Sequence, residues 1–121
     1  MNHSGNVLAF IGDAVMSLQV REYLVSLGLT KTKELQETSI RFVSAESQSK
    51  FMTSLLEREI LNENELGIYR RGRNAKSASA ANNADIKDYR IATGFEALWG
   101  YLHMTKQFER LNELWELFKS E

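Results

Sequence analysis

The sequence predicts an all-α domain, and three observations lead to that prediction. The 121 residues include no proline, so no position forbids a helical backbone. Val, Ile and Thr occur mostly singly, without the alternating runs that are typical of strands. Apolar residues recur instead at the spacings of helix faces. A chain of this length forms one domain, which we assign to residues 1–121, with residues 1–5 as a flexible lead-in.

Composition restricts the class of protein. The net charge of −1 gives no overall attraction for nucleic acid, so binding to a polyanion requires a local patch or bound cations. The chain has no cysteine, which excludes disulfide frameworks and thiolate metal sites and fits a cytoplasmic location. No apolar run is long enough to cross a membrane, and the start of the chain lacks a signal-peptide pattern.

The first predicted helix, about residues 6–27, carries one charge in its apolar half. Asp13 is the only charged residue in Val7–Val20, VLAFIGDAVMSLQV. An apolar stripe at helical spacing consists of Val7, Ile11, Ala14 and Leu18. A helix that is apolar on every side is usually buried, so we expect this half to lie in the core. A buried carboxylate needs hydrogen-bond donors, a cation or a metal, so we expect Asp13 to have such a partner.

Two shorter helices follow the turn at Gly28, which is expected to end the first helix. Residues 33–41 have amphipathic spacing, and the residues expected to face inward are Leu35 and Ile40. Ser44 can cap the next helix, whose expected buried residues are Phe51, Leu55 and Leu56. In the first turn of that helix, Glu46 is better explained by complementing the helix dipole than by a direct catalytic role, and its role is left open. The role of its neighbour Gln48 is left open.

The fourth predicted helix, about residues 63–71, begins at the capping pair Asn62 and Glu65. It leads into the basic segment YRRGRNAKS, where four of the fifteen Lys and Arg residues lie within seven positions: Arg70, Arg71, Arg73 and Lys76. Cations gather at helix C-termini for dipole reasons, which explains two of these residues. Three arginines beside the small, polar segment SASAANNAD, which reads as a mobile loop, are more typical of phosphate contact.

The fifth predicted helix begins at Asp85 or Asp88, and its apolar core spans residues 91–104. Glu96 is the only formal charge in that core. The last predicted helix, about residues 106–119, has charges of both signs on one side. Its other side is apolar and consists of Phe108, Leu111, Leu114, Trp115 and Phe118. We expect this helix to pack on the domain or on a second copy of the chain.

Asp13 and Glu96 are each the only charge on an apolar helix, and the simplest arrangement brings their carboxylates together. Two adjacent carboxylates in an apolar setting cannot both stay ionised without a cation. Mg²⁺ takes oxygen ligands and binds through one or two carboxylates together with water and phosphate. The carboxylate pair and the basic segment therefore predict metal-dependent cleavage of a phosphodiester.

Other interpretations of these residues are weaker. Either carboxylate taken alone is better explained by a hydrogen bond to a Tyr, Trp or amide in the core. Glycosidase chemistry would require a sugar cleft lined with exposed aromatic residues, which the sequence does not indicate. His103 follows Glu96 by seven residues on the same helix face, and its role, assisting the site or packing in the core, is left open.

Several segments resemble a known family. Leu8–Val15, LAFIGDAV, resembles the signature helix of the ribonuclease III endonuclease domain, and Phe95–Leu102, FEALWGYL, resembles its second metal-binding helix. Phe42–Ser49, FVSAESQS, and Arg71–Ser77, RGRNAKS, are similar to the Mini-III subgroup. That subgroup consists of the catalytic domain alone, without a double-stranded-RNA-binding domain. The resemblance extends over almost the whole chain, from about residue 6 to residue 118.

The resemblance implies an all-helical homodimer that cleaves double-stranded RNA with Mg²⁺, or with Mn²⁺ as a substitute, and leaves 5′-phosphate ends. It implies metal binding and catalysis by Asp13 and Glu96, and a dimer contact by Phe10. The resemblance implies RNA contacts by Arg71, Arg73, Asn74 and Lys76. Arg70, from the same basic segment, is added to these candidates. The Mini-III role is removal of the terminal stem of the large-subunit (23S) ribosomal RNA precursor, with a ribosomal protein as a possible presenter of the substrate.

The sequence also departs from the wider family. Further acidic residues of full-length ribonuclease III are replaced here by Asn6, Ala9 and Thr93, which is the Mini-III pattern. We therefore expect fewer carboxylate ligands per subunit, with water and RNA phosphate oxygens completing the site. The alternative functions are a catalytically silent RNA-binding or ribosome-associated helical dimer, which would have lost the carboxylates, and an unrelated helical adaptor.

Overall fold

The computed structural model describes residues 3–75 and 83–121, and all regular secondary structure in these ranges is α-helical. The helices are α1 (Gly5–Ser26), α2 (Thr32–Val43), α3 (Ala45–Glu57), α4 (Glu63–Arg73), α5 (Asn83–Met104) and α6 (Phe108–Lys119). The predicted all-α class is confirmed. Within the described ranges, we find no helix with the length and hydrophobicity needed to span a bilayer.

The helix ends follow the capping signals in the sequence. Ser44 accepts a hydrogen bond from the Ser47 backbone N–H at the start of α3. Asn62 and Glu65 form the predicted reciprocal capping box at the start of α4. Gly28 has a φ of +93° directly after the last turn of α1, a conformation that favours glycine. α5 begins at Asn83, before either predicted start, because neither Asn nor Ala prevents a helical backbone there.

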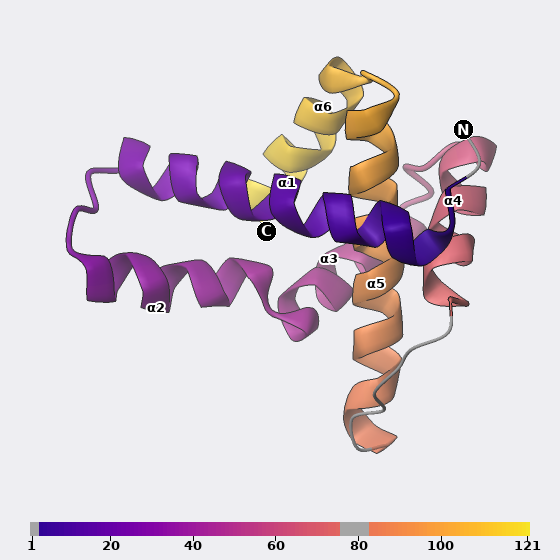
Figure 1. Ribbon diagram of the computed structural model, residues 1–121, viewed down its shortest axis with the longest axis horizontal. Helices are drawn as coiled ribbons and strands as arrows, with labels where there is room; N and C mark the ends of the chain where they lie inside the picture. Colours follow the sequence, from indigo (N-terminus) through magenta and orange to yellow (C-terminus); the bar gives the residue numbers. More distant parts are fainter. Residues whose placement is uncertain (1–2, 76–82) are drawn as a thin grey trace.

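The architecture depends on two long helices, α1 and α5, which cross at the centre of the molecule (Figure 1). α4 and α3 pack against α5, and α6 packs near its C-terminal end. α2 lies beside the second half of α1, and the two form an arm that projects from the rest of the molecule. Aromatic rings fill much of the core. The ring centroids of Phe95 and Trp99 are 4.4 Å apart, and those of Phe51 and Phe118 are 4.8 Å apart.

α1 and α5 approach until their backbones touch. A Cβ atom at Gly12 would overlap the backbone carbonyl oxygen of Glu96, and one at Gly100 would overlap that of Leu8. Only glycine permits so close an approach at either position. Asp13 directly follows Gly12, so the contact that joins the two helices also brings Asp13 and Glu96 together.

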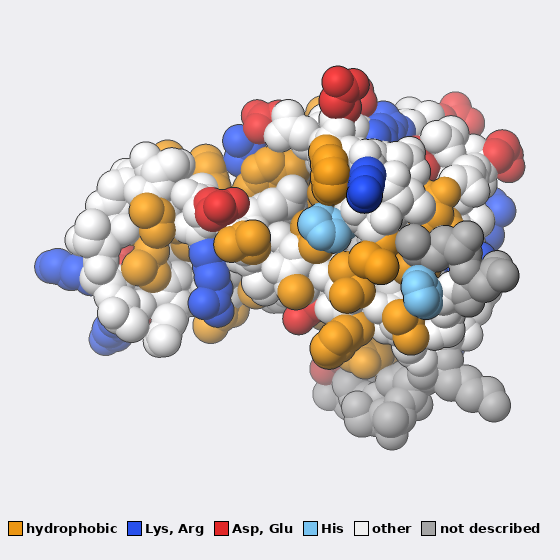
Figure 2. All heavy atoms as spheres, turned by 45° about the horizontal axis from the view of Figure 1, so that its top comes forward, with side chains coloured by type: hydrophobic (Ala, Val, Ile, Leu, Met, Phe, Trp, Pro, Cys, Tyr) orange, Lys and Arg blue, Asp and Glu red, His pale blue; other side chains and the backbone are white. Residues whose placement is uncertain are grey.

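The apolar half of α1 is buried on one face only, so the expectation that it lies wholly in the core was wrong. The buried residues of α1 as a whole are Gly5, Leu8, Ala9, Gly12, Met16, Val20 and Leu24. The predicted stripe of residues 7, 11, 14 and 18 lies on the opposite face, where Val7 and Leu18 are exposed and Phe10 is 79% exposed. α5 packs on the small residues because they allow close approach. Figure 2 shows the hydrophobic side chains that gather on the surface as a result.

α2 also differs from expectation. Leu35 is partly buried against the core, but Ile40 is 61% exposed rather than inward-facing. α2 packs along α1 and the start of α3, and its Phe42 also meets Phe118 of α6, but Ile40 lies on a side that these contacts leave uncovered. In the other short helices, Phe51, Leu55, Leu111, Leu114, Trp115 and Phe118 are buried as predicted, Leu56 is partly buried, and Phe108 is exposed.

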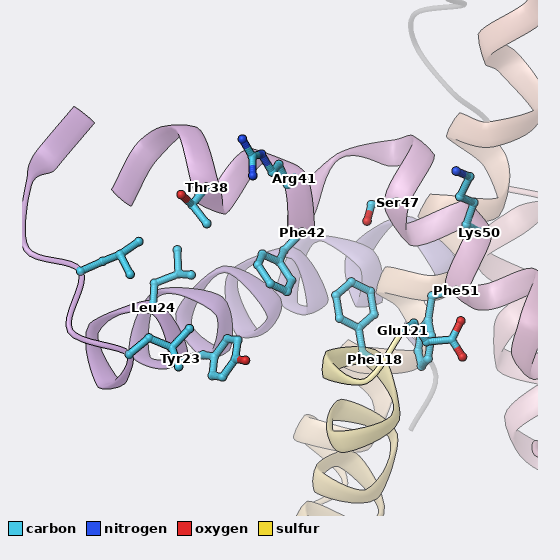
Figure 3. Close-up of a pocket in the computed structure, with 12 residues that line it drawn as sticks. Tyr23, Leu24, Thr38, Arg41, Phe42, Ser47, Lys50, Phe51, Phe118 and Glu121 are labelled. Atoms are coloured by element: carbon cyan, nitrogen blue, oxygen red, sulfur yellow. The ribbon is translucent and has the colours of Figure 1, made fainter. Parts of the chain in front are cut away.

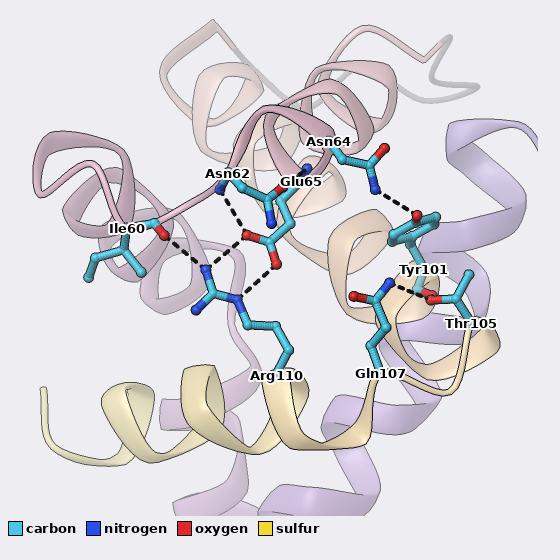
Figure 4. A network of polar contacts seen from close by, with 8 residues as sticks. All are labelled: Ile60, Asn62, Asn64, Glu65, Tyr101, Thr105, Gln107 and Arg110. Carbon is cyan, nitrogen blue, oxygen red and sulfur yellow. Dashed lines mark hydrogen bonds and ion pairs between the residues drawn. The ribbon is translucent and has the colours of Figure 1, made fainter.

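A buried ion pair fixes α4, the helix that carries the basic segment, to α6. Glu65 is 2% exposed, and Arg110 donates to its two carboxylate oxygens at 2.8 and 2.9 Å (Figure 4). Arg110 also donates to the Ile60 carbonyl oxygen at 2.8 Å. Burial raises the pKa of Glu65, but the hydrogen bonds from Arg110 and from the Asn62 backbone outweigh it, so this pKa is lowered.

Candidate active site

The two lone carboxylates of the sequence form a pair in the structure. Asp13 extends from α1 and Glu96 from α5, next to the glycine contact of these helices. The two side chains interact directly, because Asp13 affects the Glu96 carboxyl group both by a hydrogen bond and by charge repulsion. Asp13 is exposed rather than buried, so its carboxylate reaches solvent, whereas Glu96 is half-buried. The pair therefore combines an accessible carboxylate with a shielded one.

Glu96 is held by a second neighbour from α3. The Gln48 side-chain nitrogen lies 3.4 Å from Glu96 Oε2 and donates a hydrogen bond to it. The pKa of Glu96 is raised to about 8: burial is the largest cause, Asp13 adds to it by accepting a hydrogen bond and by repulsion, and the Gln48 bond opposes these effects. The raised pKa favours a protonated Glu96 near neutral pH when no metal is bound, and a divalent cation would displace that proton.

The raised pKa of Glu96 makes stability depend on pH. The folded protein holds this proton more tightly than the unfolded chain, so the resulting stabilisation is complete below about pH 4.5 and is lost as the pH rises to about 8. We expect the melting temperature of the protein in EDTA, relative to that of Glu96→Gln, to fall between about pH 5 and pH 9. Thermal melts of both proteins across this range test the prediction, and a constant difference would contradict it.

The donor set of the pair fits a hard divalent cation. Mg²⁺ commonly binds through one or two carboxylates and keeps several water ligands. Within residues 3–75 and 83–121, no third acidic or histidine side chain joins Asp13 and Glu96. At the positions that are acidic in full-length ribonuclease III, Ala9 is buried and Thr93 donates to the Tyr89 carbonyl oxygen. The remaining ligands of a bound cation would therefore come from water or substrate.

The basic segment lies at the end of α4. Arg70 is exposed, whereas Arg71 donates to the His3 carbonyl oxygen at 2.6 Å and thereby joins α4 to the start of the chain. The Arg73 guanidinium lies 5.6 Å from the Tyr69 ring centroid, and its Nε donates to the Asn74 side chain. Lys76, and the segment up to residue 82 that was predicted to be a mobile loop, lie outside the described residues.

The structure adds two cations to this segment that the sequence analysis missed. Lys87 and Arg90 of α5 line a hollow of about 500 Å³ together with Tyr69, Arg73, Asn74, Ile86 and Ile91. The cations come from helices that lie side by side, α4 and α5, so their proximity is not visible in the sequence. The sequence does place Lys87, Arg90 and Ile91 at the spacing of one helix face, and this was the signal that could have pointed to these two cations. The hollow presents three positive charges and is suited to an anionic group.

A second hollow lies elsewhere. A cavity of about 600 Å³ separates the arm of α1 and α2 from α3 and α6, and aromatic rings of Tyr23, Phe42, Phe51 and Phe118 line it (Figure 3). It includes neither carboxylate of the pair. Of the residues left open by the sequence, His103 is exposed and packs edge-on against Phe108, and Glu46 is exposed and pairs with Lys50 one turn away.

Comparisons with known proteins agree with this arrangement. Residues 6–107 match the ribonuclease III domain. The chain is 51% identical to Mini-ribonuclease 3 of Enterococcus faecalis over 92% of its own length and 84% of the relative. It is 47% identical to Mini-ribonuclease 3 of Streptococcus pneumoniae over 92% and 87% of the two chains. A crystal structure of a Fusobacterium nucleatum protein superposes with a TM-score of 0.89 at 25% identity, covering 99% of this chain and 96% of that one.

Proposed function

This chain belongs to the ribonuclease III family of endoribonucleases, and from that premise we propose that it cleaves double-stranded RNA at the Asp13–Glu96 pair. The observation that carries the proposal is the convergence of these two carboxylates from α1 and α5, with one of them open to solvent. The reaction we propose is hydrolysis of a phosphodiester in each strand, which leaves 5′-phosphate and 3′-hydroxyl ends.

Family members generally use a divalent metal, and we propose Mg²⁺, with Mn²⁺ as a substitute, held by Asp13 and Glu96. When bound, the cation supplies Lewis-acid chemistry: it acidifies a water ligand and neutralises charge that develops on the phosphate. Asp13 lies at the surface and can meet the RNA backbone, while Glu96 is half-buried beneath it. Because the pair supplies only two carboxylates, water and RNA phosphate oxygens would complete the coordination of a bound cation.

We propose that the cations of α4 and α5 bind the RNA backbone. The proposed members of this basic surface are Arg70, Arg71, Arg73 and Asn74, which the sequence suggested, and Lys87 and Arg90, which the structure adds. Lys76, which the sequence also suggested, lies outside the described residues. A-form RNA is recognised mainly through shape and contacts to phosphate and 2′-hydroxyl groups, so a positive surface that includes part of α5, the helix that carries Glu96, suits it. With a net charge of −1, the protein has little other attraction for RNA.

The double variant Lys87→Ala/Arg90→Ala is expected to weaken binding to double-stranded RNA and to reduce its salt dependence. Each lost phosphate contact lowers the slope of log K against log salt by about one. Titrations of labelled RNA at several salt concentrations measure this slope. Lys33→Ala removes an exposed cation of α2 that pairs with Glu37, and it is the control. Equal slopes for the double variant and the wild type would show that the hollow does not contact RNA.

We propose that the enzyme acts as a homodimer through the exposed apolar face of α1. Phe10 is 79% exposed, and Val7 and Leu18 extend the same apolar face. A large apolar surface of this kind marks an interaction site. Phe10 lies one helical turn before Asp13, so this interface would place two carboxylate pairs near the symmetry axis.

Phe10→Glu is expected to convert the dimer into a monomer, because a charge in an apolar interface costs several kcal/mol. Sedimentation equilibrium of the variant and the wild type measures the mass in solution. Ile40→Glu is the matched control: it places the same charge at another exposed apolar side chain, on α2. A dimeric Phe10→Glu protein would show that this face of α1 is not the interface.

We further propose that the enzyme acts in the cytoplasm and that its substrate is the terminal stem of the large-subunit (23S) ribosomal RNA precursor, presented by a ribosomal protein. The relatives named Mini-ribonuclease 3 support the enzyme class, and the basic surface supports an RNA substrate. The second candidate, a catalytically silent RNA-binding dimer, is disfavoured because both carboxylates are present and adjacent.

Incubation of the wild-type protein with a long double-stranded RNA, in Mg²⁺ and in EDTA, tests the proposed function. Fragments with 5′-phosphate ends that form only with the metal are the expected result. Intact RNA after incubation of the folded dimer with Mg²⁺ would contradict cleavage of this substrate. Binding without cleavage in the same samples would favour the silent RNA-binding protein.

A further inference from the structure

Gln48 is a buried polar residue in a position that packing alone does not explain. Its side chain is 1% exposed and lies in the first turns of α3, next to the apolar residues Phe51 and Met52. Glutamine is mostly found at protein surfaces, and a buried amide must be hydrogen-bonded. The side-chain nitrogen of Gln48 meets this need at Glu96 Oε2. The buried amide is therefore directed at a member of the carboxylate pair.

We propose that Gln48 is a positioning residue that holds the Glu96 carboxylate in place for the divalent cation, an inference that rests on the metal-dependent function proposed above. Glu96 of α5 is flanked by Asp13 from α1 and by Gln48 from α3. A carboxylate offers about four acceptor positions, so one N–H bond to Oε2 restrains the group and leaves the other positions for the cation. The restraint reduces the side-chain freedom that Glu96 would lose when the metal binds.

The placement of Gln48 is itself fixed by the packing of α3 on α5. Ser49, the next residue, donates from Oγ to Asp88 Oδ1 at 2.9 Å, which forms a second polar bridge between the same two helices. Phe51 packs edge-on against Phe95 with ring centroids 5.9 Å apart. These contacts set the register of α3, so the Gln48 amide is oriented before any cation arrives. Residues that orient metal ligands in this way commonly contribute about 10- to 100-fold to metal affinity.

If Gln48 only filled space in the core, its substitution would change the stability of the fold and leave metal affinity unchanged. The proposal predicts the opposite. An apolar side chain of similar volume would fill the same space without the cost of burying an amide. Gln48→Met should therefore leave the melting temperature unchanged or raise it, while it weakens metal binding. The Gln48–Glu96 bond is long, at 3.4 Å, so we expect an effect near the lower end of the range, about tenfold.

The experiment compares Mn²⁺ binding to the wild type, Gln48→Met and Ser49→Ala by calorimetry, together with thermal melts and RNA cleavage kinetics. For Gln48→Met we expect about tenfold weaker Mn²⁺ binding, a lower kcat, and a KM for RNA close to that of the wild type. Ser49→Ala is the matched control, because it removes the neighbouring bridge between α3 and α5 without touching Glu96. It should lower the melting temperature and leave Mn²⁺ affinity unchanged.

Mn²⁺ affinity of a folded Gln48→Met protein within about twofold of the wild type would overturn the proposal. An equal loss of affinity in Ser49→Ala would also overturn it, because the effect would then come from helix packing. Gln48→Leu replaces Gln48→Met if the latter does not fold, and failure of both to fold would assign Gln48 to folding instead. A wild type that binds Mn²⁺ without cleaving RNA would refute the proposed function alone, since the calorimetric comparison still tests Gln48.

Discussion

Asp13→Asn is expected to lower the rate of double-stranded RNA cleavage by about 1000-fold or more while the protein stays folded. Asparagine has nearly the shape of aspartate but carries no charge, so it would leave Glu96 as the only ionisable ligand of the proposed cation. A cation that stabilises transition-state charge contributes several kcal/mol, and 1000-fold corresponds to about 4 kcal/mol. Because Asp13 is exposed, the substitution creates no steric conflict in the core.

Single-turnover cleavage of end-labelled RNA, at equal enzyme excess and saturating Mg²⁺, measures this effect. Circular dichroism melts of the same samples show whether the variant is folded. In EDTA its melting temperature should stay close to that of the wild type, since the exposed Asp13 side chain is not part of the core. Glu22→Gln, which neutralises an exposed acid on the same helix, is the control and should cleave normally. Cleavage by Asp13→Asn within tenfold of the wild type would remove Asp13 from the site.

The carboxylate pair was predictable because each of its members is chemically out of place in its own helix. Asp13 and Glu96 stand alone in apolar segments 83 positions apart, and packing the two helices together is the simplest way to compensate both. The structure joins them at the glycine contact between α1 and α5. Capping residues such as Ser44 and Asn62 were equally predictable, since they act on the backbone of their own helix.

The buried face of α1 was not predictable from hydrophobicity. A helix that is apolar on every side gives no preference for one face, and the predicted stripe of residues 7, 11, 14 and 18 proved to lie on the outward face. The packing face is marked by small residues instead, Gly5, Ala9 and Gly12; Gly12 lets the backbone of α5 approach, and Gly5 lets that of α4 approach. These small residues follow one another at spacings of four and three residues, which places them on one helix face. That spacing could have identified the packing face, but the hydrophobicity of the other residues hid it.

Two other features depend on tertiary packing and could not be predicted locally. Lys87 and Arg90 join Arg73 only because α4 and α5 lie side by side. Gln48 looks like an ordinary polar residue in the first turns of an amphipathic helix, and its burial follows from the way α3 lies on α5. In both cases the sequence contains the chemical groups, while the partner helix determines what each group can do.

Gly100→Ala is expected to destabilise the protein by about 4 kcal/mol or more, the largest effect on folding that we predict. The added Cβ atom would overlap the backbone carbonyl oxygen of Leu8, and a backbone atom cannot move away by a change of rotamer. The helices would have to separate along the contact that forms the centre of the fold. The same separation would move Asp13 of α1 away from Glu96 of α5.

Chemical denaturation of Gly100→Ala and the wild type measures the loss of unfolding free energy. Gly67→Ala is the matched control: this glycine is also within a helix, α4, but a Cβ atom there would meet nothing within 4 Å. Alanine favours the helix over glycine, so the control should gain up to about 1 kcal/mol. A Gly100→Ala protein as stable as the wild type would mean that α1 and α5 do not touch at their backbones. If the variant folds in part, its cleavage of RNA should fall with its stability, because one contact determines both the helix crossing and the carboxylate pair.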